Sequence, residues 1–196
     1  MPNFIDIKDL SKSQLNQIIE NAKNWKSKQA PNFLKDKNII MIFEKPSLRT
    51  RVSFEVGVKQ LGGAVTVLNS SEFAMGERES IYDTVKVLER YIDMIVIRSF
   101  DHSLIEEFSK ISNVPVINAL TDHSHPCQVV SDLLTIKEKL GKINQKKISW
   151  FGDCNNVTQS WIEAAVIFDI ELFIATPKGI KPNAKTMDWI KKNNDK

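Results

Sequence analysis

Short apolar runs alternate with helix-like segments along most of the chain, and this alternation constrains the fold more than any other feature. The run Asn38–Phe43 predicts a buried strand, and it leads into a helical pattern with Phe54, Val58 and Leu61 on one face. Regular alternation of this kind favours parallel sheets covered by helices on both faces. We therefore expect an α/β fold with a doubly wound parallel sheet. Further strands are predicted at residues 64–68, 94–97, 114–117, 148–151 and 171–175.

The composition is that of an ordinary globular protein, with 42% hydrophobic and 26% charged residues among 196. The 27 basic and 24 acidic residues are mixed along the chain, which gives no basic stripe of the kind that nucleic acid requires. No apolar run approaches the roughly 20 residues that cross a bilayer, and the first residues lack an export signal. Two cysteines make no disulfide framework. We expect a cytoplasmic protein without nucleic-acid or membrane partners.

Polar residues follow three of the predicted strands at their carboxyl ends. Ser47–Arg51 comes after the first strand, Arg98 ends the third, and His125–Gln128 lies beyond the fourth. The fourth predicted strand contains Pro115, which favours an edge position or a strand start. Ligands of open parallel sheets bind at the carboxyl edge, so we expect these three clusters to converge on one site.

The cluster after the first strand has the chemistry of an anion site. Ser47, Arg49, Thr50 and Arg51 lie where a helix begins. A helix N-terminus offers unpaired N–H groups and a partial positive charge, and an arginine fork matches phosphate geometry. The alternative is that Ser47 only caps the helix and that the arginines are solvated.

Four motifs in order resemble the ornithine and aspartate carbamoyltransferase family, over about Leu34 to Pro182. The motif after Gly152 is similar to the ornithine branch of that family. The four motifs are Phe43-Glu44-Lys45-Pro46-Ser47-Leu48-Arg49-Thr50-Arg51, Ile97-Arg98, His125-Pro126-Cys127-Gln128 and Gly152-Asp153-Cys154-Asn155-Asn156-Val157.

The resemblance implies a transferase that moves the carbamoyl group of carbamoyl phosphate to the δ-amine of L-ornithine, giving L-citrulline and phosphate. Thr50, Arg98 and His125 would be catalytic, because donors aimed at the carbonyl oxygen stabilise the negative charge that develops there. Asn156 would contact L-ornithine. The family also implies a homotrimer in arginine biosynthesis. We expect no cofactor and no metal. The expected carbamoyl phosphate ligands are Ser47, Leu48, Arg49, Thr50, Arg98, His125 and Gln128, the last holding the amide.

Several of these residues have simpler interpretations. Arg98 is compatible with a surface ion pair, His125 with a helix start, and Gln128 with a solvated first turn. Cys127 is predicted to pack, because its spacing from His125 does not direct the two side chains at each other.

The stretch from Gly152 to Asn156 invites two other functional assignments. It lacks the second and third glycines of a dinucleotide loop. Asp153 and Cys154 are too few ligands for a metal.

The resemblance also implies two domains. Residues 1–141 are expected to form the carbamoyl-phosphate-binding domain, and residues 142–196 the start of a second, Rossmann-like α/β domain. The family continues into Ser-Met-Gly and His-Cys-Leu-Pro motifs that this sequence lacks, so we expect a fragment or a truncated product. Two strands do not make a self-sufficient sheet. Apolar surface is therefore expected to be exposed around Trp150, Phe151, Phe173 and Trp189.

Two departures from the family pattern affect the expected site. Leu48 replaces a threonine, which removes a hydroxyl and predicts weaker carbamoyl phosphate binding. In the loop 69–79, many members of the family place a glutamine or lysine that reaches a neighbouring subunit. The corresponding position here is Ala74, so we expect this contact to be either missing or supplied by Arg78. Two rival functions stay open: a non-catalytic carbamoyl-phosphate-binding or assembly module, and a carbamoyltransferase for another amine.

Overall fold

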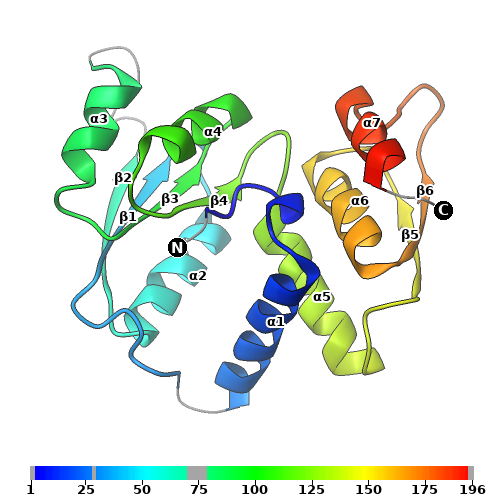
Figure 1. The fold of residues 1–196 in the computed structure, drawn as a ribbon, viewed down its shortest axis with the longest axis horizontal. Helices are drawn as coiled ribbons and strands as arrows, with labels where there is room; N and C mark the ends of the chain where they lie inside the picture. Colours follow the sequence, from blue (N-terminus) through cyan, green and yellow to red (C-terminus); the bar gives the residue numbers. More distant parts are fainter. Residues whose placement is uncertain (1–2, 28–29, 70–78, 194–196) are drawn as a thin grey trace. The chain divides into compact units, whose positions relative to one another are not determined.

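The computed structural model describes residues 3–27, 30–69 and 79–193 and divides into two compact units (Figure 1). The first unit comprises Met1–Ile5 and Trp25–Asp122, and the second comprises Asp6–Asn24 and His123–Lys196. Among the described helices, none has both the length and the apolar character that crossing a membrane requires.

The first unit is built on a four-stranded sheet in which every pairing is parallel. The order is β2-β1-β3-β4, so β1 and β3 are central. Five of the six residues of β1 are buried, as a strand covered on both faces requires. The strands span β1 Asn38–Phe43, β2 Ala64–Asn69, β3 Met94–Arg98 and β4 Val116–Leu120.

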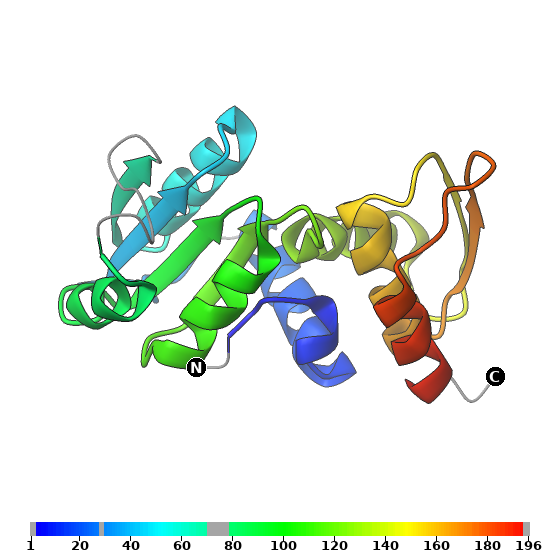
Figure 2. The ribbon, with the colours of Figure 1, turned by 90° about the horizontal axis from the view of Figure 1, so that it is seen from above.

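Helices cover both faces of this sheet, which confirms the predicted doubly wound α/β fold. Helix α2 (Leu48–Gln60) lies on one face, and α3 (Ile81–Leu88) and α4 (His102–Ile111) lie on the other (Figure 2). The alternation of β1 separates the two cores. Ile40 and Ile42 join the core under α3 and α4, whereas Ile39 and Met41 join the core under α2.

Strand β4 is an edge strand, as Pro115 predicted, and the N-terminal segment pairs with it. The Phe4 N–H donates to the Val116 carbonyl at 2.9 Å, and the Asn118 N–H donates to the Phe4 carbonyl at 2.8 Å. The strand runs from Val116 to Leu120, so it begins two residues later than the predicted range 114–117 and ends three residues later.

The second unit contains a parallel pair of strands, β5 (Lys147–Phe151) and β6 (Glu171–Ala175), with Lys147 opposite Glu171. Helix α1 begins with a capping box, because Ser11 Oγ accepts from the Gln14 N–H and Gln14 Oε1 accepts from the Ser11 N–H. The helical elements are η1 Ile7–Asp9, α1 Lys12–Ser27, α5 Pro126–Leu140, α6 Asn156–Phe168 and α7 Ala184–Asn193.

An ionic cluster with two buried carboxylates ties η1 to α6 in this unit. Lys8 Nζ donates to Asp6 Oδ2 at 2.9 Å and to Glu163 Oε1 at 3.1 Å. Burial, followed by the Asp6 charge, raises the pKa of Glu163, although Lys8 opposes this shift.

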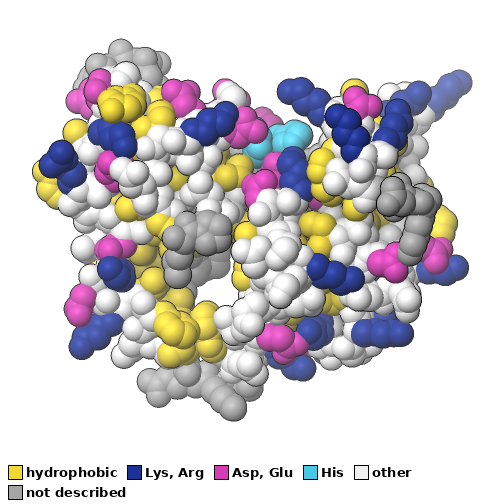
Figure 3. Space-filling model, in the orientation of Figure 1, with side chains coloured by type: hydrophobic (Ala, Val, Ile, Leu, Met, Phe, Trp, Pro, Cys, Tyr) yellow, Lys and Arg dark blue, Asp and Glu magenta, His cyan; other side chains and the backbone are white. Residues whose placement is uncertain are grey.

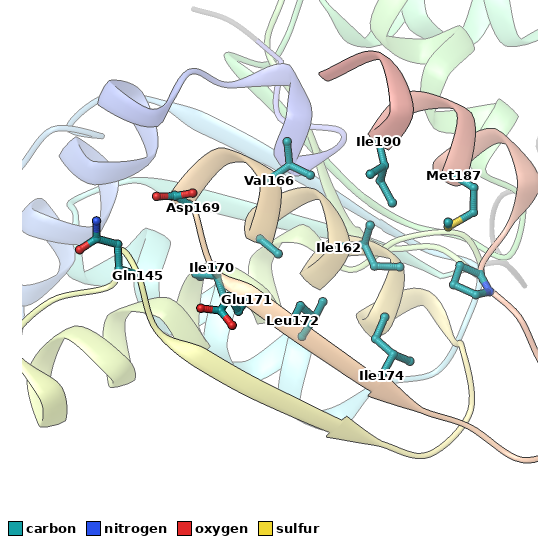
Figure 4. A pocket seen from close by; sticks show the side chains of 12 residues that line it. Gln145, Ile162, Val166, Asp169, Ile170, Glu171, Leu172, Ile174, Met187 and Ile190 are labelled. Carbon is teal, nitrogen blue, oxygen red and sulfur yellow. The ribbon is translucent and has the colours of Figure 1, made fainter. Parts of the chain in front are cut away.

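Apolar side chains of the second unit are exposed, as predicted. Phe151 is 81% exposed and Phe173 is 55% exposed on one face of the strand pair, and Trp150 and Trp189 are half-buried. A hollow of about 600 Å³ lies between α6, β6 and α7. Its wall includes Ile162, Leu172 and Ile190, whose side chains point toward one another in Figure 4.

Candidate functional site

The loops that leave the carboxyl ends of β1, β3 and β4 form a connected rim in the first unit. The Glu44 N–H donates to the Arg98 carbonyl at 2.9 Å, and the Ser99 N–H donates to the Leu120 carbonyl at 3.1 Å. The buried Ser99 hydroxyl donates to the Glu44 carboxylate and accepts the Asp101 N–H at 3.1 Å. We call residues 44–50, 98–101 and 120–122 the sheet rim; its backbone is fixed by hydrogen bonds between loops.

Helix α2 begins at the sheet rim with Ser47 as its cap. Ser47 Oγ accepts from the Thr50 N–H at 3.3 Å. This is the capping that the simpler interpretation predicted. The same hydroxyl keeps its proton for a second partner. The first N–H groups of the helix have no partner within the helix, so an anion there meets donors and a favourable dipole.

The two arginines of the motif differ in their surroundings. Arg51 Nε donates to Glu55 Oε1 at 2.8 Å, which is an exposed pair one helical turn apart. Arg49 is exposed and forms no ion pair with another described residue. Arg49 is therefore the motif guanidinium that is available to an added anion.

Arg98 and Thr50 are brought together from positions far apart in the sequence. Arg98 Nη1 donates to Thr50 Oγ1 at 3.2 Å. The Nε of Arg98 is buried and has no hydrogen-bond partner among the described residues. Burial alone lowers the pKa of Arg98. A buried donor without an acceptor costs free energy. An anionic or carbonyl oxygen bound here would supply the acceptor that Arg98 Nε lacks.

Sequence reasoning missed Lys45 and Asp122 on the same rim. Lys45 Nζ lies 2.7 Å from Asp122 Oδ1 and 4.5 Å from the centre of the Phe100 ring. The rule that placed Arg98 at the carboxyl edge would also have found these residues, because each closely follows a strand end.

Helix α4 also begins at this rim, with Asp101 as its cap. The Ser103 N–H donates to Asp101 Oδ1 at 2.9 Å. Ser103 and Glu106 have the spacing of a capping box, but the residue that caps the helix is Asp101.

His125 and Pro126 are in the second unit, at the start of α5. His125 is the N-cap residue and Pro126 is the first helical residue, as predicted. The His125 N–H donates to the buried Ser160 hydroxyl of α6 at 2.9 Å. Helix α6 therefore fixes the backbone from which the imidazole projects.

Cys127 follows in the first turn of α5, and removal from water raises the pKa of its thiol to about 12. A thiol with that pKa carries almost no thiolate near neutral pH. This raised pKa disfavours a nucleophilic role for Cys127.

Gln128 is held by a neighbour on its own helix. Its Nε2 donates to Asp132 Oδ1 at 2.9 Å, and Asp132 Oδ2 accepts the Trp161 Nε1–H from α6 at 3.2 Å. Sequence reasoning missed Asp132 and Trp161. The four-residue spacing of Gln128 and Asp132 was a usable signal for the first contact, but no local pattern points to Trp161.

Asn156 is the first residue of α6, and Asn155 caps that helix. Asn155 Oδ1 accepts from the N–H groups of Val157 at 2.9 Å and Thr158 at 3.2 Å. The two adjacent asparagines of the motif thus differ in position: Asn155 is the cap and Asn156 is the first residue of the helix.

The neighbouring Cys154 has a raised pKa. The cause is burial, followed by the charge of Asp153.

The predicted site residues therefore form two groups. Ser47, Leu48, Arg49, Thr50 and Arg98 lie on the sheet rim of the first unit. His125, Gln128 and Asn156 lie at the starts of α5 and α6 in the second unit. Convergence of all three predicted clusters stays a prediction. Ala74 and Arg78 lie outside the described residues.

The surface of the first unit and its rim suit a small anion. Over this unit, the described lysine and arginine side chains lie among acidic ones on the face that Figure 3 shows. A hollow of about 420 Å³ next to the motif is lined by residues that include Ser47, Leu48 and Asn69. Leu48 is 80% exposed, so the position where a threonine was expected faces solvent. Chemically, the rim offers guanidinium, hydroxyl and N–H donors to one anionic group.

Comparison with known proteins identifies the family of this chain. Residues 2–138 match the family model of the aspartate/ornithine carbamoyltransferase carbamoyl-P binding domain, and residues 144–196 match that of the Asp/Orn binding domain. An ornithine carbamoyltransferase of Brucella ovis is 46% identical over 97% of this chain and 62% of that protein. One of Methanococcus aeolicus is 45% identical over 93% of this chain and 60% of that protein.

Solved structures agree. The ornithine carbamoyltransferase from Pyrococcus furiosus superposes with a TM-score of 0.93 at 40% identity, covering 98% of this chain and 63% of that one. This chain thus spans about 62% of the length of the curated relatives that it matches. It belongs to the aspartate/ornithine carbamoyltransferase family.

Proposed function

We propose that this chain binds carbamoyl phosphate and transfers its carbamoyl group to the δ-amine of L-ornithine, releasing L-citrulline and phosphate. The observation that carries the proposal is the Arg98 guanidinium, which reaches Thr50 at 3.2 Å while its buried Nε lacks a partner among the described residues. Relatives that share the fold over nearly the whole chain are named ornithine carbamoyltransferases. Asn155 and Asn156 favour ornithine over other amine substrates.

The phosphate end of the substrate would lie at the start of α2. The backbone N–H of Leu48, the guanidinium of Arg49, and the hydroxyls of Ser47 and Thr50 would donate to its oxygens. Because Leu48 has no hydroxyl, this site would lack one donor of the family pattern. The helix dipole would favour the dianion over a neutral acyl donor.

The carbamoyl end would be polarised by Arg98, Thr50 and His125. When the amine attacks, the carbonyl oxygen gains negative charge, and donors already aimed at it stabilise the transition state. Gln128 would accept from the carbamoyl amide, and Asn156 would hold the amino-acid end of ornithine. Phosphate is the leaving group, so positioning and electrostatics suffice and no enzyme nucleophile is needed.

Assembly and organisation form a second part of the proposal. We place the domain boundary at residues 141/142, in the gap between the two family-model matches. Leu48, Val52 and Val56 expose an apolar stripe along α2, which supports self-association through the first domain. A homotrimer working in cytoplasmic arginine biosynthesis fits the family.

Two measurements test the proposal on the purified chain. Titration with carbamoyl phosphate measures binding, and colorimetric detection of citrulline measures transfer to ornithine. Binding with turnover supports the full proposal. Binding without turnover would favour a carbamoyl-phosphate-binding module instead, and no binding would reject both. Offering aspartate and putrescine in parallel separates ornithine from the other amine acceptors.

A further inference from the structure

Hydrogen bonds link three side chains in the second unit. They run from Trp161, midway along α6, through Asp132 to Gln128 in the first turn of α5. Trp161 is 6% exposed, and its Nε1–H donates to Asp132 Oδ2 at 3.2 Å. The other oxygen of the same carboxylate, Oδ1, accepts from Gln128 Nε2 at 2.9 Å. We call Gln128, Asp132 and Trp161 the amide relay.

The chemistry of the relay decides which way the Gln128 amide faces. A carboxylate only accepts hydrogen bonds, so the group that Gln128 turns toward Asp132 is its NH2. The carbonyl oxygen of Gln128 is then directed away from Asp132. Without this partner, the amide of an exposed glutamine turns freely and presents its donor and its acceptor about equally.

The orientation matters because the two ends of an acyl phosphate differ in what they offer. The carbamoyl group ends in an NH2, which needs an acceptor. The oxygen that the relay leaves available on Gln128 is such an acceptor. A glutamine in the opposite orientation would place its own NH2 against that donor and repel it.

We propose that Asp132, held by Trp161, is a positioning residue that makes the site selective for a carbamoyl group over other acyl groups. The inference deepens the proposed function and rests on it, since it assumes that Gln128 faces the carbamoyl amide. Asp132 itself touches no substrate. It acts by keeping one face of Gln128 toward the ligand, while Trp161 keeps the carboxylate from turning.

The simpler interpretation is that Gln128 and Asp132 are one more surface pair at helical spacing, as many helices carry. Two observations go beyond it. The carboxylate is shared with a buried indole from a different helix. The same helix also holds the His125 backbone through the buried Ser160, so α6 supports both residues that are proposed to meet the carbamoyl end.

Acetyl phosphate is the probe that isolates this contact. It carries a methyl group where carbamoyl phosphate carries NH2, so it keeps the phosphate and carbonyl contacts but offers nothing to the Gln128 oxygen. We expect the wild-type chain to bind carbamoyl phosphate about 2- to 12-fold more tightly than acetyl phosphate, the range for one neutral hydrogen bond. In Asp132→Leu this preference should fall to about 1, mainly through weaker carbamoyl phosphate binding.

Three further variants make the test specific. Gln128→Leu should remove the preference as Asp132→Leu does, and Trp161→Phe, which keeps a buried ring, should reduce it. Glu138→Gln removes the same charge from an exposed position on α5 and should leave the preference unchanged. Because Asp132→Leu risks misfolding, Asp132→Asn is measured beside it. Asparagine keeps the shape of the aspartate side chain but has one oxygen acceptor instead of two. The preference for carbamoyl phosphate should therefore fall part of the way.

The outcomes separate this inference from the proposed function. If the wild-type chain binds neither acyl phosphate, the proposed function fails. If it binds both but shows no preference, or if folded Asp132 variants keep the full preference, the relay is only a surface pair and the inference is overturned. The hydrogen bond from Trp161 to Asp132 can be tested without ligand by NMR. The indole N–H signal of Trp161 is assigned by its loss in Trp161→Phe. In folded Asp132→Leu this proton should exchange with solvent faster than in the wild type, and unchanged exchange would contradict the contact.

Discussion

The two arginines of the α2 motif give the sharpest test of the anion site, because they lie two residues apart and differ in one respect. Arg51 is paired with Glu55 at 2.8 Å, whereas Arg49 has no ion pair with another described residue. If the motif holds a phosphate group, the unpaired guanidinium should carry the interaction. Arg49→Gln and Arg51→Gln are therefore a matched pair of substitutions.

The two substitutions should weaken binding to clearly different extents. A hydrogen bond to a charged group contributes about 1.5–3 kcal/mol, so Arg49→Gln should weaken carbamoyl phosphate binding roughly 10- to 150-fold. The exposed pair of Arg51 with Glu55 is worth about 0.3–0.5 kcal/mol of stability. Arg51→Gln should therefore lower the melting temperature slightly and weaken binding less than about threefold, through the loss of one screened charge.

Isothermal titration with carbamoyl phosphate, and separately with inorganic phosphate, measures both effects. Both ligands should respond alike to Arg49→Gln, because the contact is to the phosphate end. Glu55→Gln is the control for the ion pair: releasing Arg51 should leave binding unchanged or tighten it. Equal losses in Arg49→Gln and Arg51→Gln would refute the assignment, and so would an Arg49→Gln variant that binds like wild type.

Three further predictions address single groups. Leu48→Thr adds a hydroxyl at an 80% exposed position beside the cap. Carbamoyl phosphate should therefore bind roughly 10-fold more tightly, as expected for one hydrogen bond to a charged group. Unchanged affinity would show that this position does not reach the phosphate. Hydrogen bonds from Lys37 and then from the Asn38 N–H lower the pKa of Asp93. The unfolded chain therefore binds a proton at Asp93 more readily than the folded chain does. The stabilisation from ionised Asp93 is fully present above its pKa in the unfolded chain, and it is lost as the pH falls through its pKa in the folded chain. Asp93→Asn should therefore destabilise the chain at neutral pH and much less near pH 2, by thermal melts at both pH values, and an equal loss at both would contradict this. Since the pKa of Cys127 is about 12, iodoacetamide should alkylate it near pH 8 at least roughly tenfold more slowly in the folded than in the denatured chain; equal rates would show a reactive thiol.

The strands and helices of this chain could be predicted because local pattern and tertiary role agree. In β1, a run buried on both faces is apolar at every inward position, and in α5 a proline at the first position and Gly141 after the last residue mark both ends. The errors occurred where two signals competed. Asp101, and not Ser103, is the N-cap of α4, and Pro115 precedes the fourth strand instead of belonging to it.

The candidate site was predictable only in part, for physical reasons. Residues that follow strand ends share an edge, which is why Arg98 could be expected near Thr50, and their hydrogen bond confirms that proximity. Contacts between helices have no such rule. The Trp161 indole meets Asp132 because α5 and α6 pack together, and nothing in either local sequence encodes that meeting.

The central proposal is that the guanidinium of Arg98, whose Nε is buried without a partner among the described residues, binds an oxygen of carbamoyl phosphate. The most direct test is the dissociation constant of carbamoyl phosphate for the wild-type chain and for Arg98→Met, with melting curves to establish that both are folded. We predict saturable binding to the wild type, competed by inorganic phosphate, and a loss in Arg98→Met of about 10-fold or more, as expected when a charged donor is removed. Wild-type affinity in a folded Arg98→Met variant would contradict the account.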